Sequence, residues 1–143
     1  MPEPRDDDPV LPSWPPGTVV ILVTAGGAPH AIPVSAAVRA GPRRVLLGVA
    51  HSRDSLARLR RDPRIGLVIN AAGDVSVTAY GTARVLEDDA AEGVAAVELV
   101  VERVQDHNRP TFTIESGVGW HWTDPQARDR DEQVRAALRR LAG

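Results

Sequence analysis

The chain has 143 residues, the usual length of one globular domain, and its 43% hydrophobic and 25% charged residues are typical of such a domain. Its net charge of −2 gives no basis for sequence-independent nucleic-acid binding, and the lack of cysteine excludes disulfides, thiolate nucleophiles and iron–sulfur clusters. No apolar run is long enough to span a membrane and the N-terminus is acidic, unlike a signal peptide, so we expect a cytoplasmic protein without nucleic-acid or membrane partners.

The first 17 residues hold six prolines and three consecutive aspartates. This composition favours a mobile or loosely docked arm over a packed element. Residues 18–143 are expected to form a single domain. Its first strand covers residues 18–24, a β-branched apolar run that ends in the turn sequence AGGAP.

Two further strands and a short helix are predicted next. Alternating apolar side chains predict a strand over residues 30–39, and the run RRVLLGVA predicts another over 43–50. Gly48 inside this strand marks a place where another segment approaches closely. Leucines three residues apart predict a helix within 52–63, capped by Ser52 or Asp54 and ended by proline.

The second half of the chain continues with strands. Residues 64–70 and 75–86 form a predicted hairpin around the turn sequence NAAGD. Residues 94–104 fit both a helical stripe and a strand alternation, and their many valines favour the strand. Short extended pieces are expected at 112–114 and 119–123.

A closing helix begins where Asp124 can act as N-cap and Pro125 can occupy the first helical position. Its apolar stripe consists of Val134, Leu138 and Leu141. Together the elements predict a mainly β protein: a six-stranded antiparallel split β-barrel with a short inserted helix and a C-terminal helix. A barrel of six strands is filled by its own side chains, so any cofactor must bind outside it or between two barrels.

The start of the inserted helix is the most informative segment for function. Ser52, Arg53 and Ser55 offer two hydroxyls and a guanidinium beside free helical amides, a combination that suits a phosphate monoester or diester. The alternative is that Arg53 is an ordinary solvated charge. Lysine is absent, which excludes Schiff-base chemistry, and the four histidines show no ligand spacing, so no metal site is expected.

Four stretches carry a family resemblance: GAPHAIPVS at 27–35, the strand at 43–50, SLARLRRDPRIGLV at 55–68 and VTAYGTARV at 77–85. Over roughly residues 18–87 the chain resembles the pyridoxamine 5'-phosphate oxidase-like superfamily of split barrels that bind flavin or deazaflavin. The segment 104–118, with the two tryptophans that follow it, is similar to an uncharacterised bacterial subgroup.

The resemblance implies a homodimer with a cofactor at each end of its interface. Arg53 matches an arginine that contacts the cofactor phosphate, whereas Ser55 stands where such proteins commonly carry lysine or threonine, a departure that weakens the local positive charge. Two groups match positions near the flavin ring: Val49, Ala50 and His51 on one strand, and Pro33, Val34 and Ser35 on the next. For Val34 and Val49 the alternative is plain barrel packing.

Trp120 and Trp122 form a second candidate group, because residues two apart share one face of a strand. Two interpretations remain open. Either the pair caps the barrel mouth beneath the C-terminal helix, or it reaches the partner subunit and walls the cofactor ring.

The function expected from the resemblance is a flavin-type oxidoreductase that uses FMN, or the 8-hydroxy-5-deazaflavin coenzyme, on an unknown small substrate. The alternatives are a non-catalytic carrier or regulatory module that binds the same cofactors, and a structural barrel that binds none. A true pyridoxamine phosphate oxidase is less expected, because residues 109–122 show no match to its second phosphate site. No catalytic residue can be named from the sequence.

Overall fold

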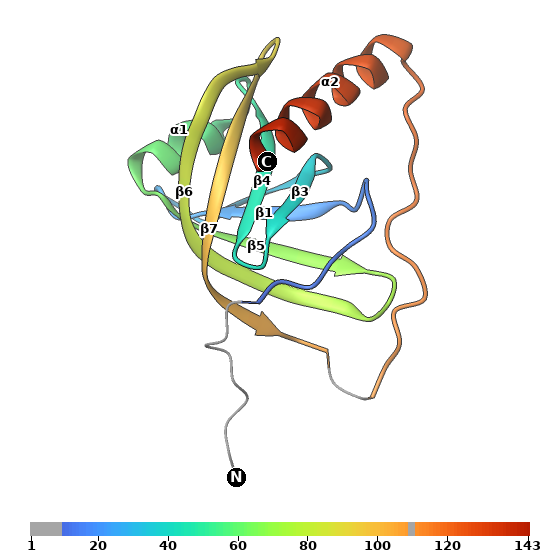
Figure 1. The fold of residues 1–143 in the computed structure, drawn as a ribbon. Coiled ribbons are helices and arrows are strands. Elements are labelled where there is room, and N and C mark those ends of the chain that lie inside the picture. The colour runs from blue at the N-terminus through green and yellow to red at the C-terminus, as the bar shows by residue number, and fades with distance from the viewer. Residues whose placement is uncertain (1–9, 109–110) are drawn as a thin grey trace.

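The structure is a computed structural model and describes residues 10–108 and 111–143. Residues 1–9 of the expected arm, and residues 109 and 110, lie outside the described part. The described chain contains these strands and helices, in order (Figure 1): β1 (Val20–Thr24), β2 (His30–Val34), β3 (Ala37–Gly41), β4 (Arg44–Ala50), α1 (Asp54–Arg61), β5 (Arg64–Ala71), β6 (Val75–Ala91), β7 (Val94–Asp106) and α2 (Pro125–Ala142).

The strands form one antiparallel sheet in the order β2-β1-β5-β6-β7-β4-β3. Its two edge strands, β2 and β3, follow each other in the chain, so the sheet must curl until its edges meet. The amide of Gly48 on β4 donates to the carbonyl of Ala36, which lies between β2 and β3, at 2.9 Å. The predicted antiparallel split barrel is therefore confirmed as the fold class.

The number of strands is seven rather than six, because the segment predicted as a single strand at 30–39 forms both β2 and β3. β2 pairs with β1, whereas β3 pairs with β4 at the other edge of the sheet. Ser35 and Ala36 carry the chain from one edge to the other. The apolar alternation continues through this change of partner, so periodicity alone gives no sign of it.

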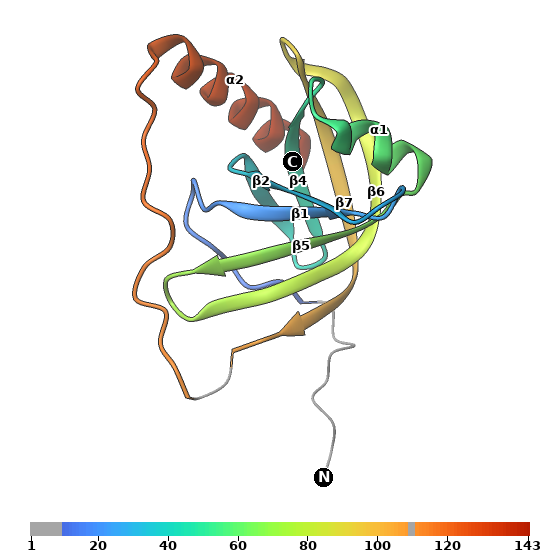
Figure 2. The ribbon, with the colours of Figure 1, turned by 180° about the vertical axis from the view of Figure 1, so that it is seen from behind.

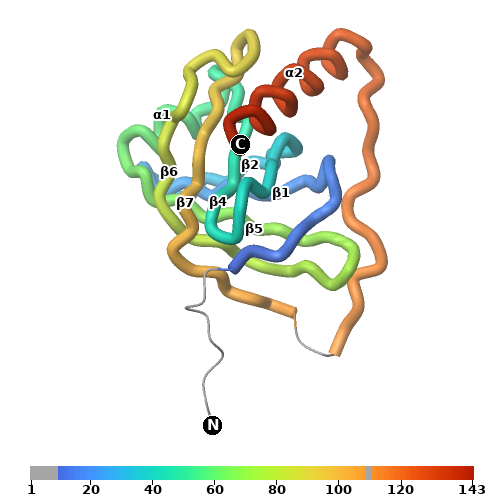
Figure 3. Tube along the Cα trace, viewed as in Figure 1, coloured from blue at the N-terminus to red at the C-terminus, as the bar shows by residue number. Residues whose placement is uncertain are grey.

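β6 and β7 are long strands that bend around the barrel (Figures 1 and 2), and β7 confirms the strand predicted at 94–104. Their pairing shifts register between Tyr80 and Gly81, at the kind of bulge that increases bending. Gly81 is required there, because a Cβ atom would lie 1.9 Å from the carbonyl oxygen of Val100. Between β7 and α2, the expected extended pieces at 112–114 and 119–123 form no strand, and the segment runs along the side of the barrel (Figure 3).

The barrel interior is packed almost entirely with valine, leucine, isoleucine and alanine. The N-terminal segment contributes to it, because Leu11 is buried and its carbonyl oxygen accepts hydrogen bonds from Arg39 at 3.0 and 3.2 Å. Trp14 packs against the same core and donates from Nε1 to the carbonyl of Ala37. Residues 10–17 are thus docked on the barrel by two apolar side chains that stand between prolines.

α2 lies across the outer face of the barrel and forms a second apolar cluster there, made of Ala36, Leu46, Ala96, Val134 and Leu138. Its start matches the prediction: the Asp124 carboxylate accepts from the amide of Gln126 at 3.0 Å, and Pro125 is the first helical residue. No helix in residues 10–108 or 111–143 is both long and apolar enough to cross a membrane.

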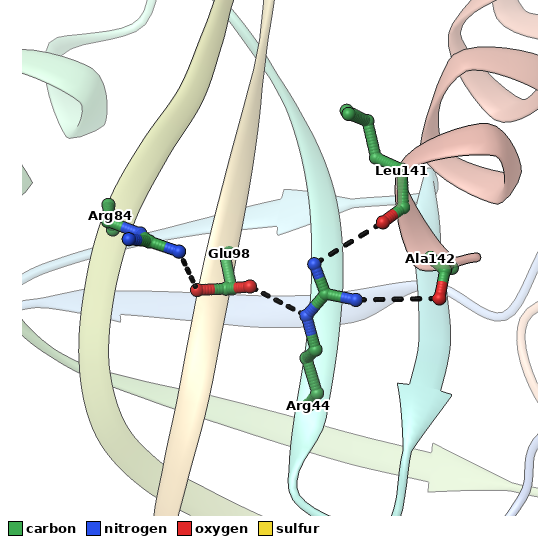
Figure 4. A network of polar contacts seen from close by, with 5 residues as sticks. All are labelled: Arg44, Arg84, Glu98, Leu141 and Ala142. Carbon is green, nitrogen blue, oxygen red and sulfur yellow. Dashed lines mark hydrogen bonds and ion pairs between the residues drawn. The ribbon is translucent and has the colours of Figure 1, made fainter.

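The C-terminal end of α2 is held by a polar network on the sheet (Figure 4). Arg44 on β4 donates to the carbonyl oxygens of Leu141 and Ala142, which lie in the last turn of the helix. The same guanidinium pairs with Glu98 on β7, which also pairs with Arg84 on β6. A cation at this position satisfies helix carbonyls that have no partner within the helix.

Candidate functional site

A cavity of about 290 Å³ lies where the N-terminal half of α2 crosses the β2–β3 connection and β4. Its walls come from four parts of the chain that are distant in sequence. The lining residues are Ile32, Pro33, Val34, Ser35, Ala36, Gly48, Val49, Ala50, Arg53, Val94, Trp122, Ala127, Arg130, Asp131 and Val134.

Gly48 allows α2 to lie this close to the barrel. A Cβ atom at Gly48 would be 2.6 Å from Cγ1 of Val134 and 3.3 Å from Cβ of Ala36. The close approach predicted for this glycine is therefore confirmed, and the approaching segment is α2. Arg135 fixes the helix further by donating to the Ser35 carbonyl at 2.6 Å while it pairs with Asp131 at 2.8 Å.

Arg53 lines the cavity from the start of α1. The prediction that Ser52 or Asp54 caps this helix is wrong, because Arg53 itself is the N-cap and its side chain makes no capping bond. Asp54 instead pairs with Arg58 at 2.7 Å, and this hydrogen bond lowers the pKa of the Asp54 carboxyl. Within the described residues no acidic side chain pairs with Arg53, so its guanidinium is available to a ligand.

The structure brings six of the ten proposed site residues together around the cavity. They are Val34, Ser35, Val49, Ala50, Arg53 and Trp122, with Pro33 beside them. Val34 and Val49 also belong to the barrel core, so each of them packs in the core and lines the cavity.

His51, Ser52 and Ser55 lie outside the lining of this cavity. His51 turns toward the β6–β7 hairpin, where Nε2 lies within hydrogen-bonding distance of the Asp88 carbonyl and 3.8 Å from an Asp89 carboxylate oxygen. Ser52 is exposed to solvent.

Ser55 is completely buried between α1 and the β1–β2 hairpin. Its Oγ lies 3.4 Å from Nδ1 of His30, and Oγ1 of Thr24 lies 3.5 Å from the same nitrogen. The Ser55 hydroxyl thus serves the packing of α1 against the barrel. A basic residue in its place would have no room to face the cavity without moving the helix.

Trp120 and Trp122 contact each other edge to face, with ring centroids 5.2 Å apart and an interplanar angle of 88°. Trp120 donates from Nε1 to the Gly17 carbonyl at 2.9 Å and lines a depression of about 450 Å³ that adjoins the cavity. Trp122 lines both that depression and the cavity itself. Within its own chain the pair lies beside Gly17 and Pro33, ahead of α2.

The sequence analysis missed the wall that α2 contributes: Ala127, Arg130 and Asp131. Its signal was present, because these residues continue the predicted apolar stripe toward the N-terminus at helical spacing from Val134. Arg130 and Asp131 were overlooked because only apolar residues defined the predicted stripe; Arg130 is in fact exposed to solvent and Asp131 is half-buried.

The lining chemistry suits binding better than proton transfer. Asp131 is the only carboxylate among the lining residues, and it forms an ion pair with Arg135. The lining contains no histidine, tyrosine, cysteine or lysine. Two guanidiniums, apolar strand residues and one indole ring remain. This set can hold an anionic group at one end of a flat, apolar ligand.

Solved structures confirm the fold. The chain is similar to a Listeria innocua protein assigned as a pyridoxamine 5'-phosphate oxidase (16% identity, 64% of this chain, 90% of that chain, TM-score 0.54). It is also similar to an FAD-binding protein from Mesorhizobium loti (16% identity, 61% of this chain, 83% of that chain, TM-score 0.51). A third similar structure is a heme-binding protein from Mycobacterium smegmatis (19% identity, 85% of this chain, 56% of that chain, TM-score 0.54).

A search of curated protein sequences finds no significant match. The family model for pyridoxamine 5'-phosphate oxidase matches residues 14–120, from the docked N-terminal segment to the first tryptophan of the pair. This match covers most of the chain and every strand of the barrel. The protein therefore belongs to the pyridoxamine 5'-phosphate oxidase family.

Proposed function

We propose that the protein binds a flavin-type cofactor, FMN or the 8-hydroxy-5-deazaflavin coenzyme, in the cavity beneath α2 and acts as an oxidoreductase on a small substrate. The observation that carries this proposal is the composition of the cavity. An unpaired guanidinium, Arg53, shares one small space with apolar strand residues and the ring of Trp122. The fold shared with the FAD-binding protein of Mesorhizobium loti supports the same conclusion.

The residues present fit such a cofactor. Arg53 is placed to bind a phosphate through two parallel hydrogen bonds, which a guanidinium forms better than any other side chain. Val34, Val49 and Ala50 supply an apolar surface, and Trp122 supplies an aromatic edge, for a flat ring system. When bound, the cofactor would supply hydride transfer, while the protein positions it and shields it from water.

The size of the cavity favours a homodimer. At about 290 Å³ it lies at the small end of ligand sites, which run from roughly 300 to 1,000 Å³, so one chain supplies only part of the enclosure. The outer face of the barrel also exposes Val23 and Val100, by 37% and 47%, around a groove that includes Tyr80. We propose that a second copy of the chain covers this face.

One observation favours the alternative of a non-catalytic carrier or regulatory module. The cavity offers no free acid or base to exchange protons with a substrate, since its one carboxylate is paired with Arg135. A carrier needs only the binding residues. A flavin enzyme that transfers hydride without side-chain acid–base catalysis also needs only these residues. A measurement of turnover therefore distinguishes an oxidoreductase from a carrier.

The test is the visible spectrum of the purified protein, followed by titration with FMN and with the deazaflavin coenzyme. Binding, with reduction or oxidation of the bound cofactor by a nicotinamide or small substrate, would establish an oxidoreductase. Binding without turnover would establish a carrier. A Soret band in place of flavin absorbance would indicate heme, and binding of neither flavin would contradict the proposal.

Sedimentation velocity tests the dimer separately. A dimer at tens of micromolar is expected, with dissociation on Val100→Glu, because that substitution places a charge in the proposed interface. The matched control is Val118→Glu, the same change at an exposed valine outside this groove, and it should leave the dimer intact. A monomeric parent protein would remove the intersubunit enclosure from the proposal.

A further inference from the structure

Two arginines from opposite sides line the cavity beneath α2. Arg53 comes from the start of α1, and Arg130 comes from the first half of α2. Within residues 10–108 and 111–143, neither guanidinium forms an ion pair, although most of the other arginines described there do. Both residues are exposed to solvent, so an anion that binds between the two guanidiniums would gain charge-assisted hydrogen bonds without displacing an acidic partner.

The neighbouring charges leave this positive pair uncompensated. Asp131 lines the cavity, but its carboxylate pairs with Arg135 at 2.8 Å, and both side chains of that pair are mostly buried. Asp129, the residue directly before Arg130, pairs with Arg128 at 3.7 Å. The nearest acidic side chain to Arg53 in sequence, Asp54, is held by Arg58.

The backbone keeps Arg130 at this position. It lies one helical turn before Val134, which packs against Gly48, and five residues before Arg135, which is hydrogen-bonded to the Ser35 carbonyl. The helix cannot rotate without breaking both contacts. Arg130 is therefore presented to the cavity by a fixed scaffold, whereas the helix that carries Arg53 contributes no second cation there, because Ser55 is buried.

We infer that Arg130 is a phosphate-binding residue, and that it and Arg53 hold the phosphate of the cofactor from opposite sides. This inference rests on the proposed function. Arg130 supplies from α2 the second positive charge that Ser55 does not supply from α1. The site then selects a flavin that carries a phosphate monoester or diester over one that ends in a free hydroxyl.

The experiment compares FMN with riboflavin, which has the same ring and side chain but no phosphate, by calorimetric titration of the full chain. Arg130→Gln is expected to weaken FMN binding about tenfold or more, the usual effect of losing a charge-assisted hydrogen bond, and to leave riboflavin binding unchanged. Arg130→Lys is expected to recover part of the loss. Arg139→Gln, a substitution of an exposed arginine on the same helix, is the matched control and should change neither affinity.

The outcomes separate this inference from the proposed function. If the parent protein binds FMN and Arg130→Gln binds it equally well, the role of Arg130 is wrong while the cofactor site stands. An equal loss for FMN and riboflavin would also overturn it, because Arg130 would then act on the shape of the cavity rather than on the phosphate. If the parent binds no phosphate-bearing flavin, the proposed function and this inference both fail.

Discussion

Arg44 Nε donates to Glu98 Oε2 at 2.6 Å, and through this contact a buried carboxylate on β7 positions the guanidinium that caps α2. Glu98 is only 5% exposed, so it depends on its two arginine partners for compensation of its charge. The same pair therefore links the barrel wall to the helix that covers the candidate site.

Replacing Arg44 with methionine is expected to lower the free energy of unfolding by about 1–3 kcal/mol, because Glu98 loses one of its two cations and the last carbonyls of α2 lose their donor. Chemical denaturation measures the loss, and hydrogen exchange should rise in the last turn of α2. Arg43→Met is the control, since Arg43 is exposed and adjacent. Equal effects of the two substitutions would contradict the role of the network.

Gly48→Ala is expected to destabilise the protein by roughly 1–3 kcal/mol, because the added methyl group collides with Val134 and overpacks the interface with α2. Thermal unfolding checks this. The double variant Gly48→Ala, Val134→Ala should be more stable than the sum of the single effects predicts, since the new methyl group then fills the space that the valine leaves. Strict additivity would show that the two positions do not touch.

The pKa of Asp62 is expected to be about 2, because its carboxylate accepts hydrogen bonds from the side chain and the backbone amide of Arg64. Because the pKa is lower in the folded protein, the ionised carboxyl stabilises the folded state at pH values above 3.8, the pKa in the unfolded chain. This contribution is lost as the pH falls through about 2. Carbon NMR titration of the carboxyl gives the value directly. In the variant Arg64→Gln the pKa of Asp62 should return toward 3.8. An unchanged pKa would show that Arg64 does not lower it.

Ser55→Lys is expected to destabilise the fold severely and not to tighten cofactor binding, because position 55 is fully buried against His30 rather than open to the cavity. Circular dichroism with thermal unfolding measures the effect. Ser52→Lys is the matched control, because Ser52 is exposed three residues earlier, and it should cost less than about 0.5 kcal/mol. A stable Ser55→Lys protein with higher FMN affinity would restore the site suggested by the family pattern.

Tryptophan fluorescence should be quenched when FMN binds, and Trp122 should account for more of the quenching than Trp120, because only Trp122 lines the cavity. The single substitutions Trp122→Phe and Trp120→Phe separate the two contributions, while Trp14 is present in both variants. Quenching that is undiminished in Trp122→Phe would place the ring of the flavin elsewhere.

Local pattern was enough to predict most elements of the barrel, since β1, β4, β5, β6, β7 and both helices follow from alternation, turn residues and caps. It was not enough to divide residues 30–39 into β2 and β3. The alternation continues although the buried face changes: Ile32 and Val34 of β2 pack in the barrel core, whereas Val38 of β3 packs in the cluster under α2. The two strands also pair at opposite edges of the sheet. Strand partners are fixed by closure of the sheet, which is a property of the whole chain.

The candidate site shows the same limit. Arg53 could be found because a phosphate-binding pattern is local to the start of a helix. The spacing of Arg130 from Val134 was visible in the sequence, but only the docking of α2 over Gly48 makes that helix face a cavity wall. Leu11 was missed for a related reason: prolines on either side of an apolar residue hide its burial from composition.

The strand order also determines when the barrel can close as the chain leaves the ribosome. β5, β6 and β7 are consecutive and pair as they appear, but β4 finds its main partner only in β7. Until β7 is synthesised, β4 and its hairpin partner β3 form an isolated two-stranded unit with an open edge, which is marginal in water and prone to pair with other chains. The cavity wall on β4 is therefore among the first parts to be made and among the last to be sheltered, so newly made chains have most need of chaperone protection over this interval.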